Sequence, residues 1–314
     1  MGERVRVATY NLYLGADLAP LLLGAPAGAD PQAAFDEVRR QLQATAFPRR
    51  VDALAAALLQ EPADLVGLQE VCLWRAGGAV LWDYQAELLA ALTRQGCPYE
   101  PVVSQPTFRG AGAVVVDGRT VDLEAAGSNT VLRRRGSRVE TAGAATGLYG
   151  SAFTVPTGAL GLEATLERGW CSVRCSVAGK PFTFVNTHTE AYDAASRDTQ
   201  RDELLGSLTD EAEPAVVVGD FNAVPEHVGM PAGFVDAWVA AGHPSAGPEA
   251  ATCCQAGDLR NEEPTLTDRI DYVWVRGARV VSATRVGASP EMRFAEGLWP
   301  SDHAGVVAEL ELPG

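Results

Sequence analysis

The stretch Pro214–Val224 reads Pro-Ala-Val-Val-Val-Gly-Asp-Phe-Asn-Ala-Val, and the expected fold is built outward from it. Ala215–Val218 is a run of apolar residues with high β-propensity, which predicts a short buried strand ending at Gly219. Asp220 and Asn222 follow two residues apart, so in extended backbone both side chains point the same way. Because α/β proteins place their chemistry at the carboxyl ends of strands, the pair is a candidate site. A plain turn is the alternative, since Gly, Asp and Asn favour turns.

Polar residues also stand beside other predicted strands. We expect strands at Val5–Thr9, Asp64–Glu70, Pro181–His188, Arg269–Val275 and Val306–Leu310, accompanied by Asn11, Glu70, His188, Asp271 and the pair Asp302–His303. Such a recurrence favours a functional site over isolated turns, because the ends of neighbouring strands meet at one edge of a sheet.

The remaining patterns complete an α/β outline. Helical spacing predicts helices within Asp36–Gln60, Trp82–Gln95, Asp193–Leu208 and Gly233–Ala241, with Pro48 breaking the first into two. Short strands are expected at Tyr99–Ser104, Ala113–Val116 and Asn129–Leu132, separated by glycine-rich turns, and a hairpin joins Arg168–Val177 to Pro181–His188. With no linker or repeat in the sequence, we expect residues 1–314 to form one α/β domain of two packed sheets flanked by helices.

The amino-acid composition indicates the general class of protein. Of the 314 residues 47% are apolar and 21% charged, which is ordinary globular composition. No apolar run approaches the ~20 residues of a membrane span. No signal peptide is recognised, so a cytoplasmic location is expected, with a secreted mature form left open. Nothing in the sequence predicts an oligomeric state.

Charge and cysteines supply two further expectations. The net charge of −15 disfavours a tight duplex binder, although the basic cluster Arg133–Arg138 is either a local phosphate-binding patch or a solvated turn. The six cysteines are Cys72, Cys97, Cys171, Cys175, Cys253 and Cys254, and no pair has C-x-x-C zinc spacing. We expect reduced, partly buried thiols, with pairing between distant cysteines left open. The adjacency of Cys253 and Cys254 is unusual.

The polar set has the composition of a hydrolytic site. It comprises Asn11, Glu70, His188, Asp220, Asn222, Asp271, Asp302 and His303. Oxygen ligands of this kind suit Mg²⁺ or Mn²⁺. Two imidazoles can hold and protonate anionic oxygens, and further carboxylates can orient them.

Six short motifs in this order resemble the endonuclease/exonuclease/phosphatase superfamily, which includes pancreatic-type deoxyribonuclease, abasic-site exonucleases, inositol polyphosphate 5-phosphatases and neutral sphingomyelinases. The motifs are Thr9-Tyr10-Asn11-Leu12, Leu68-Gln69-Glu70, Asn186-Thr187-His188, Gly219-Asp220-Phe221-Asn222, Arg269-Ile270-Asp271-Tyr272 and Ser301-Asp302-His303. They span nearly the whole chain. The resemblance implies a four-layer α/β/β/α sandwich with the site at one end of its two sheets.

The resemblance also implies a metal shell. It makes Glu70 the principal ligand of Mg²⁺ or Mn²⁺, with Asn11 and Asp302 completing the shell directly or through water.

The same resemblance assigns catalytic roles. Asp220 is expected to position or deprotonate the attacking water, and Asn222 to hold that water or a phosphate oxygen. His303, braced by Asp271, is expected to bind the phosphoryl oxygen, while His188 contacts the phosphate from the other side and assists the leaving group. In the structural alternative, Asp271 only forms a salt bridge with Arg269.

We therefore interpret the chain as a metal-dependent phosphodiesterase acting on a small or lipid-like phosphoester. A metal-dependent DNA endonuclease or exonuclease is the first alternative, and a non-catalytic binding module on the same fold is the second. The Leu-rich segment 12–23, together with Trp74, Trp82 and Trp299, would either line an apolar approach to the site or pack in the core.

Overall fold

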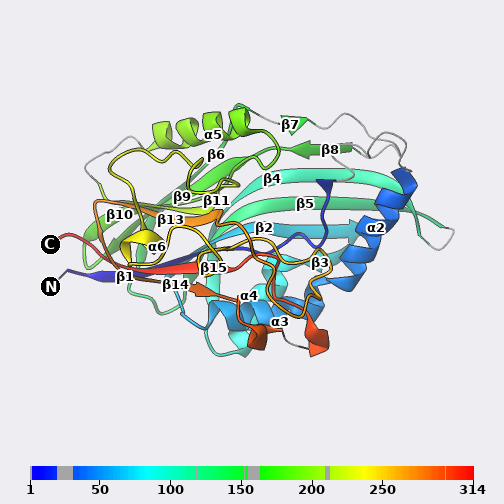
Figure 1. The fold of residues 1–314 in the computed structure, drawn as a ribbon, viewed down its shortest axis with the longest axis horizontal. Helices are drawn as coiled ribbons and strands as arrows, with labels where there is room; N and C mark the ends of the chain where they lie inside the picture. The colour runs from blue at the N-terminus through cyan, green and yellow to red at the C-terminus, as the bar shows by residue number, and fades with distance from the viewer. Residues whose placement is uncertain are drawn as a thin grey trace.

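The computed structural model describes residues 2–19, 31–116, 119–151, 153–154, 163–208, 213–293 and 295–314. Its strands form two mixed sheets, stacked between outer helices (Figure 1). This confirms the expected α/β sandwich. Of the leucine-rich segment, residues 20–23 lie outside the described residues.

The larger sheet contains the first and the last strand of the chain. Its strands are β1 (Arg4–Asn11), β2 (Leu65–Ala76), β3 (Ala79–Asp83), β4 (Tyr99–Val116), β5 (Arg119–Arg134), β7 (Phe153–Thr154), β8 (Glu163–Leu166), β14 (Arg279–Val286) and β15 (Gly305–Glu311). Their order is β14-β15-β1-β2-β5-β4-β8-β7, with β3 paired to β2. β1 and β2 are parallel, whereas β15 pairs antiparallel with β1.

The smaller sheet carries the stretch quoted first. It consists of β6 (Glu140–Leu148), β9 (Gly169–Val177), β10 (Lys180–His188), β11 (Ala215–Asp220), β12 (Val235–Asp236) and β13 (Asp271–Arg276), in the order β12-β13-β11-β10-β9-β6. All residues of β11 are buried, as its apolar run predicts. β11 pairs parallel with β10 and antiparallel with β13, which places His188 and Asp271 on either side of Asp220.

Helices cover the outer faces. α3 (Phe47–Leu58) and α4 (Tyr84–Arg94) pack on the larger sheet, where Leu54 and Leu88 join a common core with Leu68. α5 (Ala194–Ser207) covers the smaller sheet through Leu204. The other helices are α2 (Pro31–Ala44), the short α6 (Ala237–Ala240) and two 3₁₀ turns, Pro290–Met292 and Ala295–Gly297. None of the described helices has the length and apolarity that crossing a membrane requires.

The break between α2 and α3 follows the expectation from Pro48. This proline lies in the first turn of α3, where its missing N–H would have no partner within the helix. The chain therefore changes direction at Thr45 and Ala46 and begins a second helix.

A second core fills the space between the sheets. Val7 and Leu65 of the larger sheet meet Phe184 and Val218 of the smaller one. Near the site a polar bond also joins the sheets, because Gln69 Nε2 donates to Asn186 Oδ1 at 2.7 Å.

Two expected strand boundaries are wrong. The strands expected at Tyr99–Ser104, Ala113–Val116 and Asn129–Leu132 all occur, but the first two belong to the single strand β4, which pairs with β5 from Tyr99↔Arg134 to Val116↔Arg119. Its glycines suggested turns, but continuous pairing overrides local propensity. The strand expected to end at Glu70 continues to Ala76.

Candidate active site

The site lies where both sheets end on the same side. His188 ends β10, Asp220 ends β11 and Asp271 begins β13, so the register makes these three residues neighbours. The larger sheet contributes Asn11 at the end of β1, and the approach to β15 contributes His303. Residues far apart in sequence therefore meet at one edge.

Asp220 is the centre of the contacts. It is 1% exposed, and its two carboxylate oxygens accept from Asn11 Nδ2 at 3.0 Å and from the Asn222 backbone N–H at 2.9 Å. The Nε2 atoms of His188 and His303 lie 3.5 and 3.8 Å from Oδ2. Burial, followed by the charge of Asp271, raises the pKa of Asp220 to about 7.

His303 is held in one orientation by Asp271. Its Nδ1 donates to Asp271 Oδ2 at 2.8 Å, and both side chains are buried. The Asp271 backbone N–H in turn donates to Thr252 Oγ1 at 3.1 Å. Burial lowers the pKa of His303, but Asp271, Asp302 and Asp220 outweigh it and raise this pKa well above its usual value. His303 is therefore an imidazolium at neutral pH.

Asp271 does not pair with Arg269, which was the structural alternative. Arg269 Nη1 instead donates to Asp236 Oδ2 at 2.6 Å. The Asp271 carboxylate is therefore available to accept the hydrogen bond from the His303 imidazole.

His188 has the opposite electrostatic surroundings. Arg168 Nη1 lies 3.3 Å from its Nδ1 and 3.2 Å from its Nε2. Burial, then the charges of Arg168 and His303, lower the pKa of His188 well below its usual value. The ring is therefore neutral, and its 3.5 Å approach to Asp220 is not an ion pair. Arg168 is itself balanced by Glu190, with Nε and Oε2 3.5 Å apart.

Glu70 reaches the site through a β-bulge rather than a strand end. The pairing of β2 with β5 shifts between Leu68 and Val71, and Glu70 has a φ of 55°. A bulge of this kind re-aims a side chain within a continuing strand. The Glu70 carboxylate accepts from Asn11 Nδ2 at 3.2 Å and from the Leu14 backbone N–H at 2.6 Å.

Asn11 links the two acidic side chains. Its Oδ1 accepts from the Tyr13 backbone N–H at 2.9 Å, which turns Nδ2 toward Glu70 and Asp220. The orientation of the amide follows from these hydrogen bonds. In this orientation the NH₂ group faces the site, so a contact between Asn11 and a cation would run through water.

Asn222 does not follow the extended geometry expected after β11. Its φ is 46°, and its backbone N–H bonds to the Asp220 carboxylate. This is the local turn that Asp and Asn favour, so the turn and the polar site occur together. The Asn222 side chain donates from Nδ2 to the Thr189 carbonyl at 2.9 Å.

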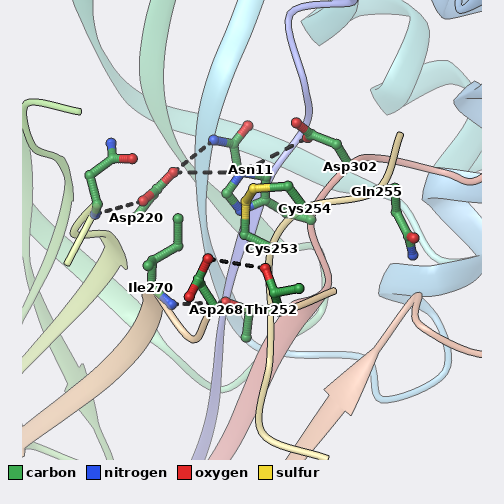
Figure 2. The surroundings of a disulfide bond; sticks show 12 residues. Asn11, Asp220, Thr252, Cys253, Cys254, Gln255, Asp268, Ile270 and Asp302 are labelled. Atoms are coloured by element: carbon green, nitrogen blue, oxygen red, sulfur yellow. Dashed lines mark hydrogen bonds and ion pairs between the residues drawn. A yellow bond between two sulfur atoms is a disulfide. The ribbon is translucent and has the colours of Figure 1, made fainter. Parts of the chain in front are cut away.

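Five residues at this edge carry no site prediction from the sequence: Arg168, Glu190, Thr252, Cys253 and Cys254. Cys253 and Cys254 form a disulfide beside Asn11, Asp220 and Asp302 (Figure 2). This corrects the expectation that the cysteines are reduced. Cys72, Cys97, Cys171 and Cys175 are free.

The sequence matches the model of the Endonuclease/Exonuclease/phosphatase family over residues 8–303. The chain belongs to this family. All eight candidate residues lie within the matched range. No curated protein matches the sequence significantly.

Solved structures of the family have the same fold. An endonuclease/exonuclease/phosphatase family protein from Bacteroides thetaiotaomicron matches with a TM-score of 0.61 and 16% identity over 100% of both chains. The family protein from Bacteroides vulgatus matches with a TM-score of 0.58 and 21% identity, covering 99% of this chain and 100% of that one. D. rerio TDP2, solved with a single-strand DNA product, matches with a TM-score of 0.56 and 16% identity over 98% and 99%.

Family membership identifies a phosphoester hydrolase in general, and members of this family generally use a divalent metal. The donor set fits such an ion, because four carboxylates converge here and one buried oxygen, Asp271 Oδ1, lacks a hydrogen-bond partner. Burial raises the pKa of Asp302 to about 7, and nearby Glu70 adds to the increase. A cation would relieve this repulsion.

Two clusters of possible metal ligands occur among the described residues, and neither is the shell that the sequence predicts. Donor atoms of Asp220, Asp271 and His303 lie within 4.8 Å of one another. The Asp271–His303 hydrogen bond already engages two of these residues, and Glu70 and Asp302 are not members of this group.

Proposed function

We propose that this protein is a phosphodiesterase that depends on Mg²⁺ or Mn²⁺ and cleaves its substrate by in-line attack of water on phosphorus. One observation carries the proposal. A single buried carboxylate, Asp220, is approached by an asparagine amide and by two imidazoles in different protonation states. This arrangement combines a base, a cationic acid and neutral hydrogen-bond donors around one point.

Asp220 is the proposed base. A base works best when its pKa is close to the working pH, and burial brings the pKa of Asp220 to about 7. The hydrogen bonds from Asn11 and Asn222 fix the direction of its oxygens. Asp220 would take the proton of the attacking water, which Asn222 helps to position.

The two histidines have different proposed roles. His303, kept protonated and oriented by Asp271, would donate from Nε2 to a phosphoryl oxygen as negative charge develops there. His188 is neutral, so it contributes a hydrogen bond rather than a full charge. Any help that it gives to the leaving group is therefore hydrogen bonding and not protonation by an imidazolium.

Glu70 and Asp302 would hold the divalent ion, with Asn11 contacting it through water. When bound, such an ion supplies Lewis-acid stabilisation of the phosphoryl oxygens. The protein orients this shell through the Leu14 N–H and the Asn11 amide, both of which donate to Glu70.

The test is hydrolysis of bis-(p-nitrophenyl) phosphate beside the monoester, with Mg²⁺, Mn²⁺ or EDTA. We expect diester turnover that EDTA abolishes and that His303→Asn reduces by at least about 10². The control is Glu249→Gln, because Glu249 is exposed and has no assigned role. Turnover of the diester that survives both EDTA and His303→Asn would refute the mechanism, and preference for the monoester would refute the assignment as a diesterase.

A nuclease is the second candidate function. The observation that favours it is the likeness in fold to D. rerio TDP2, which was solved with a single-strand DNA product. Incubating labelled single-stranded DNA with wild type, Asp220→Asn and the control Glu249→Gln tests it. Cleavage by wild type and the control alone would establish a nuclease, whereas intact DNA alongside diester turnover would exclude one. If Asp220→Asn and His303→Asn change neither turnover nor ligand affinity, the binding-module alternative fails as well.

A further inference from the structure

The Cys253–Cys254 disulfide is built into the wall of the active site. Cys253 forms β-bridges with both His303 and Asp268. On either side of it, the Ala304 N–H donates to the Thr252 carbonyl at 2.7 Å, and the Gln255 N–H donates to the Asp302 carbonyl at 2.9 Å. Residues 252–255 thus run beside residues 302–304 and hold the backbone of His303.

The two sulfurs differ in access. Cys253 is 1% exposed, whereas Cys254 is exposed. Both line a pocket of about 320 Å³, together with Asn222, Asp268 and other residues. A small thiol or a metal ion can therefore reach Cys254 from solvent without unfolding of the site.

The sulfurs also lie close to an imidazole. One donor atom each from Cys253, Cys254 and His303 falls within 4.8 Å of the other two. His303 Nδ1 is engaged by Asp271, so Nε2 is the ring nitrogen left for a cation, which it can bind only after losing its proton. Two thiolates and one imidazole form a ligand set typical of Zn²⁺, unlike the oxygen set that suits Mg²⁺.

We propose that reduction of the Cys253–Cys254 disulfide creates a binding site for a thiophilic divalent cation of the Zn²⁺ class, formed by Cys253, Cys254 and His303. A cation bound at this site engages the His303 ring, which is then no longer available to hydrogen-bond a phosphoryl oxygen. The oxidised protein cannot bind the cation in this way, because both sulfurs are used in the disulfide. The protein therefore has a soft-metal site next to its hard-metal site.

The reduction step requires a dithiol. One thiolate of the dithiol attacks Cys254 Sγ, the S–S bond breaks, and Cys253 leaves as a thiolate that takes up a proton. The second thiol of the reductant then displaces Cys254 from the mixed disulfide. Cys253 and Cys254 end as thiols, and the dithiol ends as its own disulfide. Cation binding then releases the thiol protons.

The direct test is a titration with Cd²⁺, read by the ultraviolet absorption of Cd²⁺–thiolate bonds. We expect one Cd²⁺ per chain after reduction and removal of the dithiol, and none at this site before reduction. Cys254→Ser should abolish the signal, whereas Cys97→Ser, which removes a partly buried thiol outside this cluster, should leave it unchanged. Loss of the imidazole in His303→Ala should weaken binding by about tenfold or more.

Several results would overturn the proposal. These are equal Cd²⁺ absorption before and after reduction, an unchanged signal in Cys254→Ser, or loss of the signal in Cys97→Ser. If Cys254→Ser fails to fold, the wild-type protein supplies the second measurement, since iodoacetamide should alkylate the exposed Cys254 after reduction. Mass spectrometry locates the modification, and Cd²⁺ absorption that survives complete alkylation of Cys254 would refute the site.

An activity measurement adds the functional consequence. With Mg²⁺ in excess, Zn²⁺ should inhibit diester hydrolysis by reduced wild type at least tenfold more strongly than by oxidised wild type or Cys254→Ser. Equal inhibition of all three would overturn the claim about His303. The binding measurement does not depend on turnover, so failure of the proposed hydrolase and failure of the cation site are separate outcomes.

Discussion

At the scale of single residues, Glu70 and Asn222 share a left-handed backbone, with φ values of 55° and 46°. This conformation is uncommon outside glycine and often occurs where function fixes a side chain. In both cases the unusual backbone brings a polar group to the Asp220 end of the sheets. The sequence indicated which residues belong together. It could not reveal the bulge at Glu70, because a bulge exists only in the pairing of β2 with β5.

Replacing Glu70 tests the proposed metal shell. Glu70→Gln keeps the shape of the side chain but removes its charge, so we expect Mn²⁺ affinity to fall by about 10- to 100-fold, with turnover partly restored at high Mn²⁺. Calorimetric titration measures the affinity. The exposed Glu249→Gln is the matched control. Equal Mn²⁺ affinity in wild type and Glu70→Gln would remove Glu70 from the shell.

Asp220 should make the metal-free protein less stable as the pH rises. The pKa of its carboxyl is about 7 in the folded state and 3.8 as its ordinary value, so between these values the native state holds a proton that the unfolded state has lost. Stability therefore falls as pH increases through this window. We expect Asp220→Asn to remove on the order of 1–3 kcal/mol of this pH dependence. Thermal unfolding at pH 5 and pH 8 in EDTA measures it, and parallel slopes for the two proteins would contradict the assignment.

At the scale of elements, strand register explains which contacts were predictable. The hairpin β9–β10 turns at Ala178 and Gly179, whose positive φ values are typical of a two-residue turn. Its register pairs Gly169 with His188, so Arg168 comes next to the imidazole. The sequence predicted this hairpin and therefore contained the signal for Arg168.

Other contacts at this scale could not be read from the sequence. Glycines within β4 and β5 suggested turns, because the sequence alone does not show that these two strands pair along their length. The sequence also could not show that Cys253 and Cys254 form a disulfide, since adjacency alone does not predict one. By contrast, β11 was predictable because a short apolar run bounded by Pro and Gly is typical of a buried strand.

The close approach of the sheets at Gly67 gives a second prediction about stability. A Cβ on Gly67 would lie 2.5 Å from Val218 Cγ2 and 2.8 Å from Asn186 Cγ. We expect Gly67→Ala to lower the free energy of unfolding by about 1–3 kcal/mol through overpacking. Gly127→Ala is the control, because its Cβ would meet its nearest atom at an ordinary 3.5 Å. Denaturant unfolding that fails to distinguish the two variants would show that the sheets can separate at low cost.

At the scale of the whole molecule, charge limits which substrates approach. The net charge is −15, and arginines of the basic cluster are already paired: Arg134 with Asp64 at 2.6 Å, Arg138 with Glu3 at 3.2 Å, and Arg133 with Glu100. Arg135 and Arg138 are exposed at the turn after β5, so the structure favours the solvated turn over a free phosphate patch. We also propose that residues 1–314 fold as one domain, because strands of both sheets share the core between them.

This charge predicts an unusual salt dependence. If single-stranded DNA is a substrate, its KM should decrease as NaCl rises from low to physiological concentration, since salt screens the repulsion between two polyanions. The KM of bis-(p-nitrophenyl) phosphate should change much less. Steady-state kinetics on both substrates provides the comparison. An increase in the DNA KM with salt would instead reveal a local cationic binding surface.

The position of β15 has a consequence for biosynthesis. This strand lies between β14 and β1, and the residues just before it supply Asp302 and His303. A ribosome adds these residues after the other strands of both sheets, so β1 lacks one neighbour and the site lacks the His303 side chain until this region has been translated. The pairing of β15 with β1 and β14 consequently completes the larger sheet and brings Asp302 and His303 to the site in the same step.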